Sequence, residues 1–393
     1  MQMNRRLALK SLGIGSLIAA TGAGQIAFAE ANTDKRLVFV FLRGAMDGLS
    51  VFPAYGDPDF ETARAGIAMP PPGEEGGVLD LDGFFGIHPL MPEVRQAFAD
   101  GEMAIVHAIA SPYRERSHFD AQNLVENGSA EPYGLKTGWL NRALVGLPSA
   151  GGDIGVSITS SMPVLMRGDA AVTSWSPSTM AQPTEDLVTR VARMYAEDAA
   201  LQDAFMKAKA ANESMIGASD GSSNFPALMQ SAATFLKDDT GPRVAFLELG
   251  GWDTHAGQMG YLGALHRNMV AVNDSLTAFK ASIGPVWKDT VIVYVTEFGR
   301  TVAMNGSNGT DHGTAGAAFL IGGAVKGGRV IADWPGLKPS QQYQGRDLMP
   351  TADMRSLFKG VLRDHLGVDA AHLEQAVFPD SRGAAPMTGL LKA

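Results

Sequence analysis

The sequence contains no cysteine, and this absence excludes two kinds of stabilisation. Without cysteine, the chain can form neither a disulfide framework nor a thiolate metal site. Any metal ion must therefore be bound by histidine, aspartate or glutamate, and stability must come from a hydrophobic core. The 393 residues are 45% hydrophobic and 19% charged, which is the composition of a folded globular protein.

Net positive charge is also absent, since the formal charge at pH 7 is −9. Such a chain does not attract a nucleic-acid backbone or an anionic membrane surface at long range, so no nucleic-acid partner is expected. The sequence has no Walker A or dinucleotide fingerprint, no internal repeat and no low-complexity tract. Residues 217–221, "GASDG", match a serine-hydrolase pattern, but they follow a helical pattern instead of a strand, so we reject them as a nucleophile turn.

The apolar stretch near the N-terminus is too short and too often interrupted by glycine for a good membrane anchor. Residues 1–29 contain the adjacent Arg5 and Arg6 and end with small residues at Ala27 and Ala29. This pattern predicts a twin-arginine export signal cleaved after Ala29. Cleavage removes basic residues and no acid, so the net charge falls from −9 to −12. We expect an acidic periplasmic or secreted protein with no integral membrane segment after signal removal.

Short apolar runs of strand type alternate with helical patterns along the rest of the chain. Strands are expected within 35–43, 102–111, 243–251, 289–300 and 313–330, and helices within 90–101, 117–128, 184–212 and 260–284. This alternation predicts an α/β fold, a three-layer α/β/α sandwich with a mostly parallel central sheet. Residues 34–390 are expected to form a single domain, with a cap or insertion at about 150–240.

Polar side chains collect where these expected strands end or begin, and ligands bind beyond the carboxyl ends of the strands in open α/β sheets. The residues concerned are Asp47, Arg114, Arg116, Ser117, His118, Asp253, His255, Glu297, Arg300, Asp311 and His312. Carboxylates and imidazoles bind hard or borderline cations. We therefore expect one or two divalent metal ions, which would be zinc, manganese, magnesium or calcium.

Each of these residues also has a simpler structural interpretation. Asp47 precedes a glycine as in a normal turn, and Asp253, His255 and His312 are also consistent with polar turns. Glu297 is harder to explain in this way, because an acid that continues a buried strand should be paired or bound to a metal. Structural or surface roles are assigned to His88, His107, His266, His365 and His372.

Ser117 is the candidate nucleophile. It precedes a helical pattern, and the free N–H groups and dipole at a helix N-terminus favour an oxyanion or a bound phosphate or sulfate. Arg114 and Arg116 could clamp such an anion, and Arg300 is a further candidate for this role. The alternative is that Ser117 is only a helix N-cap.

Several segments together resemble the DUF1501 family of twin-arginine-exported bacterial proteins. They are "VFVFLRGAMDGLS", "SPYRERSHFDAQNLVENG", "GGWDTHAGQ", "TEFGRTVAMNGSNGTDHGTAG" and "DLMPTADMRSLFKGVLRDHLGV". That family is in turn similar, more distantly, to the alkaline phosphatase and sulfatase superfamily. The resemblance implies an alkaline-phosphatase-like sandwich with a two-metal site and a Ser or Thr nucleophile.

By this resemblance, Asp47 is similar to the first-strand acid that binds one metal, and Ser117 to the metal-bound nucleophile. Asp253, His255 and His312 are similar to the ligands of the other metal.

Glu297 falls where the superfamily has the Asp of an Asp-His pair, and Phe298 stands where a histidine ligand is expected. His118 and Asp311 are further candidate metal ligands.

The leading hypothesis is an exported metal-dependent hydrolase that uses Ser117 to cleave phosphate or sulfate esters, with small-molecule or glycan esters as substrates. One alternative is a non-catalytic periplasmic binding or assembly protein that retains the fold, which Phe298 and the acidic charge favour. Another is a metal-dependent phosphotransferase or mutase. No protein partner is predicted.

Overall fold

The computed structural model describes residues 33–147, 153–177, 185–206, 224–260 and 263–392. The expected export signal and the rejected "GASDG" pattern lie outside the described residues, as do parts of the expected cap. Within the described ranges, no helix is long and apolar enough to cross a membrane.

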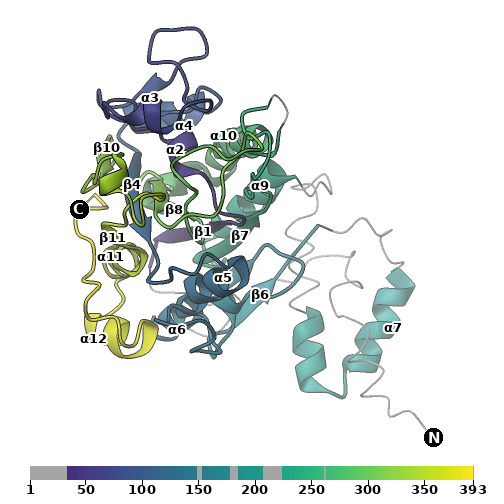
Figure 1. Ribbon diagram of the computed structural model, residues 1–393. Helices are drawn as coiled ribbons and strands as arrows, with labels where there is room; N and C mark the ends of the chain where they lie inside the picture. Colours follow the sequence, from purple (N-terminus) through teal and green to yellow (C-terminus); the bar gives the residue numbers. More distant parts are fainter. Residues whose placement is uncertain (1–32, 148–152, 178–184, 207–223, 261–262, 393) are drawn as a thin grey trace, which may run out of the picture.

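A nine-stranded sheet forms the centre of the fold (Figure 1). Its order is β10-β4-β9-β8-β1-β7-β5-β6, and β11 pairs with β4. Each observed pairing is parallel except those that β9 makes with β4 and β8. The strands are β1 (Arg36–Leu42), β4 (Met103–Ala110), β5 (Gly155–Ser157), β6 (Val172–Ser174), β7 (Val244–Leu249), β8 (Thr290–Val295), β9 (Gly316–Ile321), β10 (Arg329–Ile331) and β11 (Ala352–Asp353). A separate short hairpin pairs β2 (Leu79–Asp80) with β3 (Gly86–Ile87).

Helices cover both faces of this sheet. The α-helices of the described residues include α2 (Gly48–Val51), α3 (Phe60–Ala63), α4 (Pro92–Ala99), α5 (His118–Asn127), α6 (Trp139–Val145), α7 (Glu185–Tyr195), α9 (Phe225–Leu236), α10 (Ala264–Ile283), α11 (Met354–Leu366) and α12 (Ala370–His372), and of these α7 does not cover the sheet (Figure 1). Residues of β1 alternate between the two faces, as the two-residue period of a strand requires. Val38 and Val40 pack with α4, α9 and α10, whereas Leu37 and Phe39 pack with α6 and α11. The predicted three-layer sandwich with a mostly parallel sheet is therefore confirmed.

The expected helix at 184–212 is broken in the structure. The first helix, α7, ends at Tyr195, and a second helical segment covers 199–206. The break follows from Asp198, whose Oδ1 accepts hydrogen bonds from the N–H groups of Ala200 and Leu201 at 3.1 and 3.3 Å. An aspartate in this position caps a new helix start. In Figure 1, α7 stands away from the sheet, whereas β5 and β6, from the same expected cap, extend the sheet beyond β7.

The reversed direction of β9 determines where the polar residues meet. Residues that follow β1, β4, β7 and β8 lie at one edge, since these four strands point the same way. Because β9 is antiparallel to β4 and β8, the loop that precedes Gly316 lies at this same edge. Asp311 and His312, in that loop, are thus placed beside the residues that follow the other four strands.

The contacts of Phe39 predict its contribution to stability. Its ring is 1% exposed and lies 5.4 Å from Trp139 and 5.6 Å from Phe358, measured between ring centroids. Phe39→Ala should lower the free energy of unfolding by about 3–5 kcal/mol, because it leaves a cavity between β1 and the α6 and α11 layer. Urea denaturation measures this loss. Phe119→Ala is the matched control: Phe119 is 82% exposed, and the change should stay within about 0.5 kcal/mol. Equal losses would contradict the assigned packing.

Candidate metal centre

Three histidine rings converge at the carboxyl edge of the sheet. His118 begins α5, His255 follows β7, and His312 precedes β9. Nε2 of His312 lies 2.9 Å from Nε2 of His118 and 2.9 Å from Nε2 of His255. These three histidines and Asp253 are called the histidine cluster below.

The opposite nitrogen of each ring faces an oxygen acceptor. Nδ1 of His118 lies 2.7 Å from Glu297 Oε1, and Nδ1 of His255 lies 3.1 Å from Asp311 Oδ1. Nδ1 of His312 lies 3.0 Å from the carbonyl oxygen of Arg116. A neutral ring that donates its Nδ1 proton to such an acceptor has a bare lone pair on Nε2. Three lone pairs directed at one another are unfavourable alone, and a cation among them removes the repulsion.

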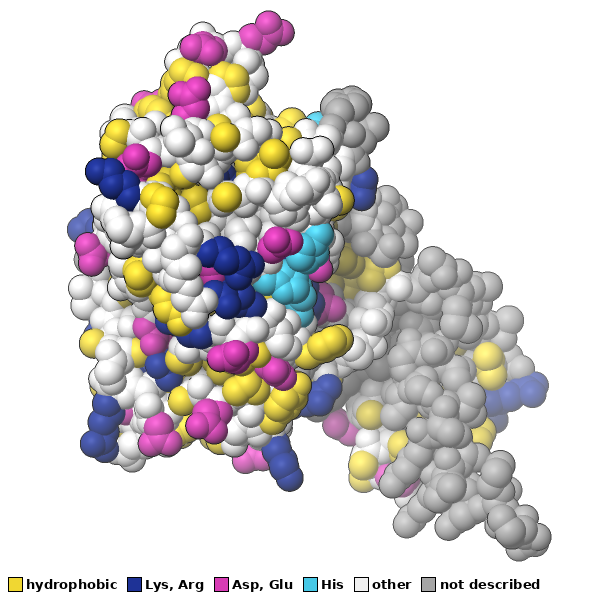
Figure 2. Space-filling view, in the orientation of Figure 1, with side chains coloured by type: hydrophobic (Ala, Val, Ile, Leu, Met, Phe, Trp, Pro, Cys, Tyr) yellow, Lys and Arg dark blue, Asp and Glu magenta, His cyan; other side chains and the backbone are white. Residues whose placement is uncertain are grey.

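Asp253 completes the cluster. Its Oδ1 lies 3.0 Å from Nε2 of His255 and 3.3 Å from Nε2 of His312, and its Oδ2 lies 3.4 Å from Nε2 of His118. The ligand atoms of His118, Asp253 and His312 all lie within 4.8 Å of one another. Imidazole nitrogens and a carboxylate oxygen are ligands that suit zinc and similar divalent ions, so the donor set fits a metal. The structure therefore has a possible His/Asp metal site. Figure 2 shows histidine side chains grouped on an open face, beside acidic and basic side chains.

Close contact between two turns holds Asp253 in place. Gly44, just after β1, has φ of 112°, and a Cβ there would lie 2.6 Å from the backbone nitrogen of Asp253. A larger residue would therefore push the two turns apart. The neighbouring Trp252 is 1% exposed, and its backbone N–H donates a hydrogen bond to the Arg43 carbonyl at 3.2 Å. The turn after β7 is thus anchored on its inner side while Asp253 faces the cluster.

Glu297 supports His118 from behind. It is fully buried, and its Oε1 accepts hydrogen bonds from Gly44 N–H, Gln122 Nε2 and His118 Nδ1 at 2.9, 2.9 and 2.7 Å. Its Oε2 accepts one from Thr296 Oγ1 at 3.1 Å. Both oxygens are therefore engaged, and the structure does not place Glu297 among the grouped ligand atoms. A carboxylate that accepts the Nδ1 proton of a ligand histidine fixes that ring's orientation.

Asp311 occupies the equivalent position behind His255. Its Oδ1 also accepts from Asn305 Nδ2 at 3.0 Å.

Phe298, the residue that stands where a histidine ligand was expected, packs against two of the rings. Its centroid lies 4.9 Å from that of His118 and 5.3 Å from that of His312. Phe298 is therefore an apolar wall of the cluster. The imidazole beside it is that of His118, which comes from the start of α5.

Asp47 lies apart from the cluster. It is 1% exposed, accepts from the N–H of Leu49 at the start of α2, and forms an ion pair with Arg64 at 2.6 Å. The structure thus brings together His118, Asp253, His255 and His312, but not the carboxylate of Asp47.

The predicted arginines have different environments. The guanidinium of Arg114 donates to the carbonyls of Ser111 and Tyr113, and the buried Arg300 donates to Asp253 Oδ1 at 2.6 Å. All three guanidinium nitrogens of Arg300 therefore bind acceptors within the protein, and Nη1 of Arg114 does so as well.

Arg116 borders the cluster in a strained backbone conformation. Its φ of 60° turns its carbonyl toward His312, and its side chain pairs with the buried Asp347 at 2.8 Å. Arg346, which sequence reasoning missed, donates to the His312 carbonyl at 2.8 Å, and its side chain is 42% exposed. It lies in a loop outside the ends of the predicted strands, so no pattern marked it.

Ser117 occupies the N-cap position of α5, directly before His118. Its side chain makes no capping hydrogen bond to the helix. The hydroxyl is therefore not used in the way that a simple N-cap role requires.

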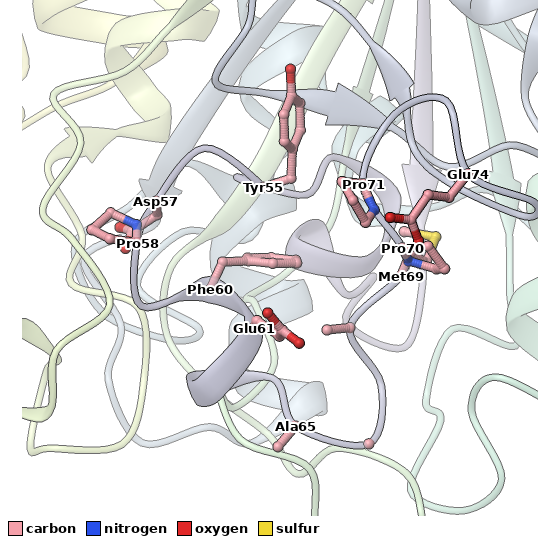
Figure 3. Close-up of a pocket in the computed structure, with 12 residues that line it drawn as sticks. Tyr55, Asp57, Pro58, Phe60, Glu61, Ala65, Met69, Pro70, Pro71 and Glu74 are labelled. Atoms are coloured by element: carbon pink, nitrogen blue, oxygen red, sulfur yellow. The ribbon is translucent and has the colours of Figure 1, made fainter.

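A separate cavity of about 770 Å³ lies in the segment between α2 and β2. Figure 3 shows the Phe60 ring crossing the cavity, with Glu61 below it and Pro70, Pro71 and Glu74 opposite. Acidic groups would repel an anionic ester, and none of the lining residues belongs to the histidine cluster. This cavity is therefore not the expected substrate site.

Three of the histidines assigned structural roles are buried. Burial lowers the pKa of His88, His107 and His365 to about 4, so they stay neutral at pH 7.

The profile of the family described as "Protein of unknown function (DUF1501)" matches residues 104–375. The chain belongs to the DUF1501 family. No curated protein sequence matches it.

Solved structures with similar architecture share little sequence with this DUF1501 protein. The C-terminal periplasmic domain of EcEptC from Escherichia coli is 10% identical, with a TM-score of 0.40, covering 92% of this chain and 91% of that chain. The lipoteichoic acid synthase LtaP from Listeria monocytogenes is 10% identical, with a TM-score of 0.38, covering 94% of this chain and 81% of that chain. The PsFucS1 sulfatase from Pseudoalteromonas sp. is 13% identical, with a TM-score of 0.34, covering 77% of this chain and 65% of that chain. Similarity of this degree identifies no activity.

The pair of His118 and Glu297 predicts a pH-dependent stability in metal-free protein. Burial alone raises the pKa of Glu297, but hydrogen bonds from His118 and Gln122 outweigh it and lower the pKa; the bond to Glu297 in turn raises the pKa of His118. The raised pKa of His118 adds to the free energy of unfolding. This contribution is complete below about pH 6.5 and is lost as pH rises through the raised pKa. The lowered pKa of Glu297 also adds to the free energy of unfolding. This contribution is complete above about pH 4.3 and is lost as pH falls through the lowered pKa. The pair therefore stabilises most between these limits.

Glu297→Gln should lower the free energy of unfolding more at about pH 5.5 than at about pH 8.5, measured by urea denaturation in the presence of a chelator. Glu126→Gln is the matched control, because Glu126 pairs with Arg43, which stays charged at both pH values. A Glu297→Gln loss that does not change with pH would contradict the assigned pairing.

Proposed function

We propose that this DUF1501 protein is an exported metal-dependent hydrolase of phosphate or sulfate esters. The observation that carries the proposal is the convergence of three Nε2 atoms and a carboxylate, with each Nδ1 held by an oxygen acceptor. A purely structural cluster would not need three unprotonated lone pairs at one point. The side chain of Asp253 is 42% exposed and that of His255 45%, so a substrate can reach the cluster from solvent.

His118, His255, His312 and Asp253 would hold the metal. A divalent ion bound there would polarise an ester oxygen and lower the pKa of a water molecule. Glu297 and Asp311 keep the rings of His118 and His255 in the required tautomer and orientation.

Arg116 and Arg346 are proposed to bind the anionic oxygens of the ester. Both lie beside His312. Although both pair with Asp347, their side chains keep 19% and 42% of their surface exposed, whereas the side chain of Arg300 is fully buried. Guanidinium groups match the geometry of phosphate and sulfate oxygens. The overall acidity of the protein gives no long-range attraction, so this local pair must supply the recognition.

Ser117 is the proposed nucleophile. Its hydroxyl makes no cap bond, and it precedes His118 at the start of a helix of 10 residues, whose N–H groups favour a developing negative charge. In the proposed reaction, Ser117 Oγ forms a bond to phosphorus or sulfur while the bond to the leaving alcohol breaks. The hydroxyl proton leaves through solvent, and water then releases the acid product.

A non-catalytic binding protein is the second candidate. The observation that favours it is the environment of Asp47, whose carboxylate pairs with Arg64 instead of joining the cluster. If this candidate is correct, the metal stabilises the protein and no ester is turned over.

We further propose export by the twin-arginine route, supported by Arg5, Arg6 and the small residues before position 30, with small-molecule or glycan esters as substrates.

Ser117→Ala should reduce ester turnover by about 10³-fold or more while metal content per chain stays unchanged, because the serine attacks the ester and is not needed to bind the ion. Turnover of 4-nitrophenyl phosphate and sulfate, with metal content by mass spectrometry, measures both quantities. Ser160→Ala, at an exposed serine, is the control and should be silent. Unchanged turnover in Ser117→Ala would remove Ser117 from the mechanism. Absence of turnover in wild-type protein that binds metal would favour the binding protein.

A further inference from the structure

A buried polar network lies directly behind Asp253, outside the histidine cluster. Five of its side chains are almost completely inaccessible to solvent. Their exposed fractions are 1% for Asp47, 0% for Arg64, 2% for Gln258, 0% for Thr310 and 2% for Arg300. Polar groups at such depth are costly unless each one is hydrogen-bonded.

Every acceptor position of Asp47 is in use. Its Oδ2 accepts from Arg64 Nη2 and Gln258 Nε2 at 2.6 Å each and from Ser50 Oγ at 2.9 Å. Its Oδ1 accepts from the N–H groups of Leu49 and Ser50 at 3.0 and 3.2 Å. Arg64 thus provides the positive charge that this buried carboxylate requires.

Gln258 connects Asp47 to the loop before β9. Its Nε2 donates to Asp47, so its Oε1 must face the other way, where it accepts from Thr254 Oγ1 at 2.8 Å and Thr310 Oγ1 at 2.6 Å. Backbone bonds join the same two loops, since Gln258 N–H donates to the Asn308 carbonyl at 2.8 Å and Thr310 N–H to the Thr254 carbonyl at 3.1 Å. The loops that carry His255 and His312 are therefore fixed to each other.

Thr310 connects Gln258 to Asp253 through the guanidinium group of Arg300. Its hydroxyl donates to Gln258 and accepts from Arg300 Nε at 3.2 Å, while its carbonyl accepts from Arg300 Nη2. The third nitrogen, Arg300 Nη1, then donates to Asp253 Oδ1 at 2.6 Å. Donor and acceptor are determined at every step from Asp47 to Asp253, so the network permits one arrangement.

We propose that this network positions Asp253 as a metal ligand, and that Arg64 takes the place of a second ion at Asp47, so that the protein binds a single metal ion. Arg300 restrains the Asp253 carboxylate on one side, which leaves it oriented toward the three imidazoles. Asp47 acts on the metal only through Gln258, Thr310 and Arg300. The inference rests on metal binding at the histidine cluster, as in the proposed function, but not on hydrolysis.

Thr310 offers a matched pair of variants for the test. Thr310→Val keeps the shape of the side chain and removes the hydroxyl, whereas Thr310→Ser keeps the hydroxyl. Zinc affinity, measured by competition with a chromogenic chelator, should weaken about 10–100-fold in Thr310→Val and stay near the wild-type value in Thr310→Ser. Thermal unfolding of the zinc-free variants, monitored by circular dichroism, verifies that both are folded.

Asn268→Leu is a further control. Asn268 Nδ2 donates to the Gly250 carbonyl at 2.9 Å, so this variant loosens the same turn without touching the network, and its zinc affinity should not change. If Thr310→Val lowers thermal stability but leaves zinc affinity intact, the network is merely structural and the positioning role is overturned. If Thr310→Val does not fold, Gln258→Met replaces it, with the same expected loss of zinc affinity and the same overturning result.

Zinc content per wild-type chain tests the other half of the proposal. One ion per chain is expected, and two would overturn the assignment of Arg64. If wild-type protein binds no zinc and no other divalent ion, this inference and the proposed function both fail. If zinc binds and Thr310→Val binds it equally well, the inference fails and the proposed function stands.

Discussion

The arrangement at the carboxyl edge depends on three hydrogen bonds that hold the Nδ1 side of His118, His255 and His312. Each bond places a proton on the outer nitrogen, so the inner nitrogen is left as a lone pair. The acceptors belong to three different parts of the chain: Glu297, Asp311 and the Arg116 carbonyl. Three features of the structure hold these acceptors in position. They are the left-handed backbone of Arg116, the burial of Glu297 and the backbone hydrogen bonds that restrain the loop before β9.

Much of the fold could be predicted, because the core strands are continuous apolar runs. β1, β4, β8 and β9 are buried along their whole lengths, which is typical of strands covered on both faces. The direction of β9 could not be predicted, since an apolar run carries no sign of direction. Because β9 is reversed, His312 lies at the same edge of the sheet as His118 and His255. If β9 were parallel to β8, the loop before it would lie at the opposite edge.

The group of polar residues could be predicted from strand ends, but their individual positions could not. Position at a strand end indicates that a side chain is near the edge, and not which way it points. Glu297 thus lies behind His118, and Asp311 behind His255. Asp47 meets Arg64 because the turn-rich segment after α2 folds back onto the sheet edge, and nothing in the sequence indicates this contact. Arg346 comes from an irregular loop with no periodic pattern.

The cluster draws its members from segments near residues 118, 253 and 312, which are far apart along the chain. An ion held by all three would act as a cross-link among α5, the turn after β7 and the loop before β9. Its binding free energy would then add to the free energy of unfolding in proportion to the logarithm of free ion concentration. The local opening of these loops, and hence their susceptibility to proteases, would depend on the metal supply of the surrounding compartment.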